Sequence, residues 1–355
     1  MCRNNHMINS LLTILVACIP YNLQAQKPFR VGTTAANFLE IGYGAAGCGM
    51  GDAYVSMARG LSAIYWNPAG LAYLNKQQAL FVYQPWFVDS QSMLISVGYN
   101  IPTLGTFAIS MVSMNFGAME VTTLAQQEGT GQKFTAVDQS FGFSYSRKLA
   151  DSFATGVSLK YISSQIWDLN ASAFAFDLGV LINTSFFSPT GNSREGLTIG
   201  MSISNYGTKM SYDGMQLLYP IDILEEEDGN YAYAEGQYAL QEWDLPLIFR
   251  LGISVNLLYT DNHQITVSTD ALHPNNNSEA LNIGTQYLLK IPTIGKLYMR
   301  CGYKALFMDS SEYGPTFGFG VRLNKLFNTG IEIGYAHRSI GILGDSESIS
   351  IGIYF

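Results

Sequence analysis

The histidines and cysteines of this chain, which could serve as nucleophiles, bases or metal ligands, are few and scattered. After residue 25 they comprise three histidines and two cysteines: His263, His273, His337, Cys48 and Cys301. No group of them has the spacing of a zinc site. Ser339 stands two residues after His337, and a serine hydrolase needs a histidine with a nearby serine and an orienting group. We interpret His337 as an interfacial side chain instead, and we predict a protein that is not an enzyme and has no metal and no cofactor.

A glycine pattern near the N-terminus also invites a chemical interpretation. The spacing Gly42-x-Gly44-x-x-Gly47 matches the dinucleotide-binding fingerprint. That fingerprint follows a hydrophobic strand and opens a βαβ unit, and neither is present here. We therefore interpret the glycines as a segment that turns tightly inside a confined space.

Composition excludes several classes of protein. Only 13% of the 355 residues are charged, 13% are aromatic, and 35 are glycine, whereas a soluble domain is about 25% charged. Disordered chains are rich in charge and poor in aromatics, so disorder is excluded. The net charge of −8 comes with no basic block, so we expect no nucleic-acid partner. After residue 20 no apolar run approaches the roughly 20 residues of a spanning helix.

Residues 1–25 are typical of a secretory signal peptide. Arg3 supplies a positive start, the stretch from Met7 to Ile19 is mostly apolar, and Ala25 offers a cleavage site. An alternative is a bacterial lipobox at Leu15-Val16-Ala17-Cys18, which would lipidate Cys18. Export would place Cys48 and Cys301 in an oxidising compartment.

From residue 77 onward apolar and polar residues alternate with the period of a β-strand. Ile349, Ile351, Ile353 and Phe355 alternate with Ser348, Ser350, Gly352 and Tyr354. One face is apolar, and the other carries glycine, serine, asparagine and occasional basic residues. A soluble β-sandwich also alternates, but these strands run about 10–14 residues where soluble strands average about five or six. The pattern indicates a wall with lipid outside and a polar lumen inside.

We count fourteen strands: 77–84, 91–100, 104–115, 134–149, 151–164, 171–186, 196–206, 246–259, 263–272, 280–290, 296–306, 314–323, 328–338 and 346–355. Connections after odd strands are the longer ones, above all 207–245, which carries the acidic run from Glu225 to Asp228. Those after even strands are mostly tight, with 187–195 the exception. Outer-membrane barrels combine short periplasmic turns with long outer loops. The sequence therefore predicts an all-β, fourteen-stranded antiparallel transmembrane barrel over residues 77–355.

The same alternation places several charged side chains in the lumen: Lys160, Arg250, Arg300, Lys304, Arg322 and Glu332. They suggest either a polar path or a site for an anionic head group; alternatively they pair with residues such as Asp52. Cys301 has lipid-facing parity, so we expect no disulfide with Cys48. The last alternating positions, Ile349, Ile351, Ile353 and Phe355, resemble the signal read by the barrel-insertion machinery.

Residues 26–76 do not alternate, and here a family resemblance is specific. The run from Gly44 to Val55, followed by Ala63 to Ala72 with Asn67-Pro68-Ala69-Gly70 in it, resembles the hatch of FadL-like outer-membrane barrels and is most similar to the PorV/PorQ branch. Asn37-Phe38-Leu39 also suits that branch. One departure is Ala58-Arg59-Gly60, where many relatives carry an acidic pair.

The resemblance implies that residues 26–76 fold into the lumen as a plug with short helices. It also implies that the motif residues hold this plug: Gly47, Gly49, Gly51, Asp52, Asn67, Pro68, Ala69 and Gly70.

Two functions follow from the resemblance. One is a non-enzymatic barrel that serves protein secretion or surface attachment, related to type IX secretion. The other is a FadL-like channel for hydrophobic small molecules. The expected partners are outer-membrane lipid and lipopolysaccharide, the barrel-insertion machinery and, for the first function, secreted proteins or secretion components.

Overall fold

The computed structural model describes residues 31–188, 191–192, 195–221, 234–308, 311–326 and 329–355. The predicted signal peptide, with both Ala25 and Cys18, and the acidic run from Glu225 to Asp228 lie outside these residues.

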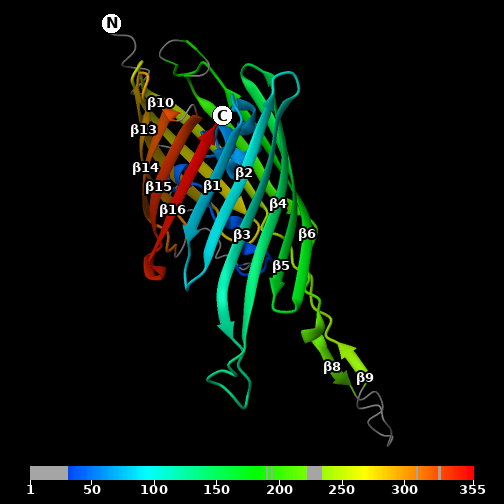
Figure 1. The fold of residues 1–355 in the computed structure, drawn as a ribbon. Helices are drawn as coiled ribbons and strands as arrows, with labels where there is room; N and C mark the ends of the chain where they lie inside the picture. The colour runs from blue at the N-terminus through cyan, green and yellow to red at the C-terminus, as the bar shows by residue number, and fades with distance from the viewer. Residues whose placement is uncertain (1–30, 189–190, 193–194, 222–233, 309–310, 327–328) are drawn as a thin grey trace, which may run out of the picture.

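Fourteen antiparallel strands form a closed barrel, as the sequence predicts (Figure 1). Each pairs with its neighbour along the chain, except that β7 pairs with β10, and β1 closes the ring against β16 from Gln78↔Tyr354 to Tyr83↔Ile349. The strands are β1 (Gln78–Pro85), β2 (Gln91–Ile101), β3 (Gly105–Glu120), β4 (Lys133–Ala150), β5 (Phe153–Ile166), β6 (Leu169–Asn183), β7 (Thr198–Gly207), β10 (Ile248–Tyr259), β11 (His263–Pro274), β12 (Ala280–Ile291), β13 (Gly295–Leu306), β14 (Pro315–Leu326), β15 (Thr329–Ser339) and β16 (Asp345–Tyr354).

The wall has the polarity of a membrane barrel rather than of a soluble sheet. On β4, Phe141 and Phe143 are 45% and 50% exposed on the outside, whereas Ser140 and Ser144 are at most 4% exposed on the inside. Apolar side chains that face outward and small polar ones that face inward suit lipid on one side and a packed lumen on the other. The closed ring also leaves no strand edge unpaired in the bilayer.

The strand boundaries differ from the predicted ones by a few residues, and three of the differences are instructive. β3 continues to Glu120 because a bulge between Asn115 and Ala118 lets it keep pairing with β4. The connection between β5 and β6 is shorter than predicted, because β5 ends at Ile166 and β6 begins at Leu169, with only Trp167 and Asp168 between them. The long 207–245 connection contains a two-stranded sheet, β8 (Leu218–Ile221) with β9 (Ala234–Gln237), which projects beyond the barrel end in Figure 1.

The segment before β1 holds only short helical turns. They are η1 (Asn37–Glu40), α2 (Ala45–Cys48), η2 (Gly60–Ser62), α3 (Ala63–Trp66) and η3 (Pro68–Tyr73). α2 contacts β14, β15 and β16, and η3 contacts β3 to β6, so the segment lies across the lumen between opposite walls, as the blue trace in Figure 1 shows. We refer to residues 31–76 as the plug. Within the described residues, no helix has the length and apolarity needed to cross a bilayer.

Candidate functional site

The plug meets the barrel wall by backbone contact at glycines. A Cβ on Gly302 of β13 would lie 2.3 Å from the carbonyl carbon of Met50, and one on Gly284 of β12 would lie 2.3 Å from the Met50 carbonyl oxygen. Gly49 also lies close to Gly318 of β14, where a Cβ on Gly49 would be 2.8 Å from the Gly318 Cα. Only glycine permits such an approach. Two of the predicted motif glycines, Gly49 and Gly51, therefore touch the wall directly.

Asn67 anchors the other end of the plug to the opposite wall. Its side chain is fully buried, and Oδ1 accepts from the backbone N–H of Ala69, which caps η3. Nδ2 donates to the carbonyls of Val55, at 3.2 Å, and Val180 of β6, at 3.0 Å. Pro68 stands at the first position of η3, where its missing N–H costs nothing.

Wall glycines again receive this part of the plug. A Cβ on Gly156 of β5 would lie 2.4 Å from the Pro68 carbonyl carbon, and one on Gly179 of β6 would lie 2.2 Å from Asn67 Oδ1. Gly70 is confined within the plug itself, because its Cβ would lie 2.3 Å from the Ala58 carbonyl oxygen. The Asn-Pro-Ala-Gly motif thus combines a cap, two hydrogen bonds to carbonyls and close packing.

Asp52 holds the centre of the plug by charge. Its Oδ2 lies 2.7 Å from Lys304 Nζ on β13 and 3.6 Å from Arg338 Nη1 on β15, and all three side chains are at most 12% exposed. Arg338 also lies over the ring of Trp86, 5.5 Å from its centroid. Buried charges need such partners, since an unpaired one is costly.

The glycines of the dinucleotide-like pattern make room for Trp66. A Cβ on Gly47 would lie 2.4 Å from the indole, and one on Gly42 would lie 2.8 Å from it. Trp66 is 2% exposed, and its Nε1 donates to the Tyr43 carbonyl. Gly44 has a φ of 95°, a conformation that favours glycine. The pattern therefore serves packing and a turn.

The predicted lumenal cations separate into two groups. Lys304 pairs with Asp52, Lys160 pairs with Asp177 at 2.6 Å, and Arg250 donates to Ser204 at 2.9 Å. These three tie the wall to the plug or to itself. Arg300 and Arg322 instead line a cavity.

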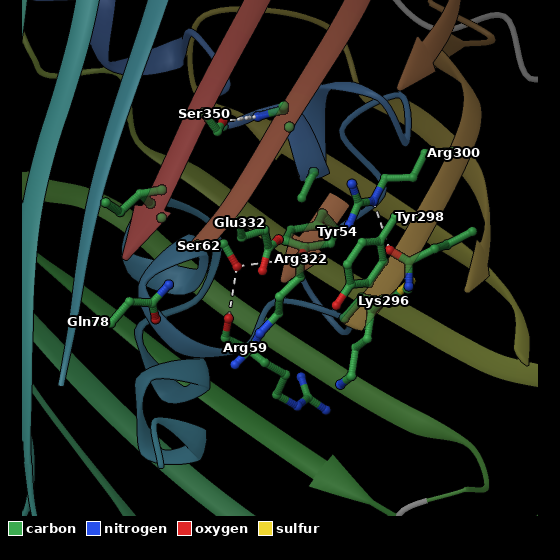
Figure 2. A pocket seen from close by; sticks show the side chains of 18 of the residues that line it. Tyr54, Arg59, Ser62, Gln78, Lys296, Tyr298, Arg300, Arg322, Glu332 and Ser350 are labelled. Carbon is green, nitrogen blue, oxygen red and sulfur yellow. Dashed lines mark hydrogen bonds between the residues drawn. The ribbon is translucent and has the colours of Figure 1, made fainter. Parts of the chain in front are cut away.

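That cavity, of about 260 Å³, lies between the plug and the wall formed by β12 to β16 and β1. Figure 2 shows Arg300, Arg322, Lys296 and Glu332 around it, with Arg59 of the plug below. Lys296 is the second residue of β13, and Tyr354 ends β16, so the cavity lies toward the end of the barrel that carries the short turns. In outer-membrane barrels this end faces the periplasm.

The sequence interpretation missed Lys296 and Arg338, although their parity with Arg300 and Glu332 would have placed both in the lumen. It noted Arg59 only as a departure from relatives. Arg59 lines the cavity, and its guanidinium donates to the carbonyls of Ser56 and Ala58, both at 2.9 Å.

Cys48 and Cys301, the two cysteines among the described residues, are free and lie apart. Cys48 is buried in the plug, where its thiol donates to the Gly42 carbonyl, and burial raises its pKa to about 11. Cys301 is exposed on the outside of β13. His337 Nε2 lies 3.7 Å from Asp345 Oδ1 near the barrel end with the longer loops. The described residues contain no cluster of three or more histidine, cysteine or acidic side chains that could hold a metal.

The residues of the predicted insertion signal lie on the outer surface. Ile349, Ile351 and Phe355 are 37%, 39% and 56% exposed, and Ile353 continues the same side of β16.

Comparisons with solved structures support the same fold. The crystal structure of the Pseudomonas putida toluene transporter TodX aligns with a TM-score of 0.55 and 10% identity, covering 88% of this chain and 97% of that one. A Pseudomonas aeruginosa FadL homologue aligns with a TM-score of 0.51 and 12% identity, covering 88% and 98%. The Ralstonia pickettii toluene transporter TbuX gives 0.51 and 11%, covering 88% and 97%. No curated protein matches the sequence.

The family is shown by the sequence itself. The family described as type IX secretion system protein PorV matches residues 23–220, more than half of the chain. Together with the closed fourteen-stranded barrel and its FadL-like neighbours, this match places the protein in the outer membrane. The chain belongs to the PorV family of outer-membrane barrels associated with type IX secretion.

Proposed function

We propose that this protein is a non-enzymatic component of type IX secretion, a closed barrel that presents its outer end to exported proteins or to other secretion components. The observation that carries the proposal is the docking of the plug. Its backbone contacts glycines on opposite walls, at Gly302 on β13 and Gly156 on β5, at distances that leave no room even for a methyl group.

An apolar cluster also joins the plug to the wall in the outer half of the lumen. Phe38 and Leu39 of the plug, each 4% exposed, pack against Met114, Ile162 and other apolar side chains of the wall. The apolar surface that a hydrophobic cargo would need is thus covered by the chain itself. A barrel closed in this way is better suited to hold or dock partners than to pass molecules.

The part of the chain available for docking is the extension that carries β8 and β9. It stands clear of the barrel in Figure 1, and it exposes Leu218, Tyr219 and Ile221 on one strand. Exposed aromatic and aliphatic side chains on a projecting element are typical of protein-binding surfaces.

The experiment replaces residues 218–237 with a short Gly-Ser linker in the bacterium. Loss of exported proteins from the cell surface, with the barrel still folded and present in normal amount, is the expected result. Normal secretion with this variant and with the full gene deletion would refute the proposal.

A second candidate is a channel for hydrophobic small molecules. It is favoured by the toluene transporters among the structural neighbours and by the apolar surface beneath Phe38 and Leu39. Under this function, deletion of the gene lowers uptake of a hydrophobic compound and leaves the surface proteins unchanged.

A further inference from the structure

The cavity at the short-turn end of the barrel holds cations that the protein does not neutralise. We propose that it binds a small dianion of the phosphate-monoester class through Lys296, Arg300 and Arg322. This inference does not depend on the secretion function, because binding is measured on the purified barrel alone.

The first argument is the contrast with the other lumenal cations. Lys160 and Lys304 each have a carboxylate oxygen within 2.7 Å. Among the described residues, no carboxylate oxygen lies within 4.0 Å of a side-chain nitrogen of Lys296, Arg300 or Arg322. Other buried cations of the lumen are paired with carboxylates, whereas these three are not.

The second argument is that their donors are available. Lys296 Nζ makes no hydrogen bond within the described part of the chain, and Arg300 uses Nε for Gln286, at 2.8 Å. The guanidinium of Arg322 lies on the ring of Tyr354, 3.7 Å from its centroid, which fixes its plane and leaves its N–H edge free. Guanidinium edges match the oxygens of a phosphate.

The third argument is the balance of charge. Of the described residues that line the cavity, Glu332 is the one with a carboxylate, and its Oε2 already accepts from Tyr354 Oη at 2.7 Å. Lys296, Arg300, Arg322 and Arg59 line the cavity against this one carboxylate, so the excess is three positive charges, and a dianion neutralises two of them. Arg59 contributes charge rather than free donors, because its guanidinium already donates to plug carbonyls.

The size and position of the cavity restrict the kind of ligand that it can bind. A cavity of about 260 Å³ is below the usual 300–1,000 Å³ of drug-sized sites, so it fits a phosphate with a small substituent. Gly320 and Gly352 keep the wall beside Arg300 and Tyr354 free of side chains. The closed wall separates the cavity from the bilayer, which favours a soluble periplasmic phosphate over a lipid head group. Because plug and wall both line the cavity, the ligand would also bridge them.

The test is isothermal titration calorimetry on the purified full barrel in zwitterionic detergent and phosphate-free buffer. The probes are inorganic phosphate and glycerol 3-phosphate, with succinate as the carboxylate comparison. The variants are Lys296→Gln, Arg322→Gln and the double variant. Lys290→Gln is the matched control. Lys290 is on β12 and pairs with Lys296 on β13, but it is not part of the cavity lining.

We expect each single variant to weaken phosphate binding about tenfold and the double variant to abolish it, with Lys290→Gln unchanged. Glu332→Gln should tighten binding, which keeps the test informative if a cation variant folds poorly. Unchanged affinity in the double variant, an equal loss in Lys290→Gln, or no binding by the native barrel would overturn the site. Succinate binding as tight as phosphate would overturn the ligand class. Flotation with phosphatidic acid vesicles distinguishes a lipid head group from a soluble phosphate. If the barrel binds these vesicles, the double variant does not, and neither binds the soluble phosphates, the proposal of a soluble ligand is overturned.

Discussion

Substitution of Gly302 by alanine should loosen the plug, because this glycine receives the Met50 backbone. The new Cβ would lie 2.3 Å from the Met50 carbonyl carbon and 2.5 Å from the Gly51 nitrogen. Ordinary contact begins near 3.4 Å, so plug and wall must separate by about 1 Å. Overpacking of this kind costs about 1–3 kcal/mol. Both clashing atoms are backbone, so no side chain can rotate away.

The matched control is Gly352→Ala. Gly352 lies on the lumenal face of β16, but its Cβ would meet nothing closer than 3.6 Å. Neither glycine has a positive φ, so both tolerate alanine in backbone terms, and the two variants differ in the plug contact alone.

Cys48 reports the state of the plug, since its thiol is buried two residues before Met50. In a Cys301→Ser background it is the one thiol after residue 30. If labelling requires transient opening, 1–3 kcal/mol corresponds to a labelling rate about 5- to 150-fold faster. The assay follows maleimide labelling of the folded barrel by mass spectrometry. A Gly302→Ala barrel that labels no faster than Gly352→Ala would refute the idea that backbone contact with wall glycines holds the plug.

Three further substitutions or conditions probe the same plug. Asn67→Asp keeps the size but loses both donated hydrogen bonds, so the free energy of unfolding in a urea titration should fall by at least about 2 kcal/mol; an unchanged midpoint would contradict the anchor. Asp52→Ala should cost about 3–5 kcal/mol by leaving Lys304 and Arg338 unpaired, and adding Lys304→Met should restore part of it; no recovery would argue against the ion pair. The Cys48 thiol, with its pKa raised by burial from 9.0 to about 11, should react with iodoacetamide only as the pH approaches 11. The folded state keeps its proton longer than the unfolded state, so plug stability should also fall as pH rises from about 9 to 11; reaction at pH 8 at the rate of a free thiol would contradict this.

The barrel could be predicted from the sequence because period-two alternation is a local signal. Each of the fourteen strands shows it independently, and the lipid and the lumen require opposite side chains at successive positions. The ends of β3 were less predictable, since the bulge between Asn115 and Ala118 depends on the partner strand. The β8–β9 pairing escaped prediction for a different reason: its strands are only four residues each, too short for a period to show.

The plug contacts were beyond prediction because they join residues far apart in the chain. Parity placed Lys304 in the lumen and left its pairing with Asp52 open, and only the structure brings the two within 2.7 Å. Why Gly302 is glycine could not be inferred, because its neighbour Met50 lies some 250 residues away and contributes backbone rather than a recognisable side chain. The lumenal positions of Arg338 and Lys296, by contrast, could have been predicted from strand alternation.

The apolar part of the plug bears on the choice between secretion and transport. Phe38 and Leu39 are almost fully buried against the outer lumen, and exposing two such side chains costs about 3–6 kcal/mol. At 1.4 kcal/mol per factor of ten, the withdrawn state would have a population of about 10⁻² to 10⁻⁴. A channel would need its cargo to replace these side chains, so the double variant Phe38→Ala with Leu39→Ala should raise hydrophobe uptake if transport is the function. If the native barrel acts closed, a strain with the native gene should take up no more hydrophobe than a strain lacking the gene. Uptake by the native strain above that level, raised further in the double variant, would therefore refute the closed-barrel proposal.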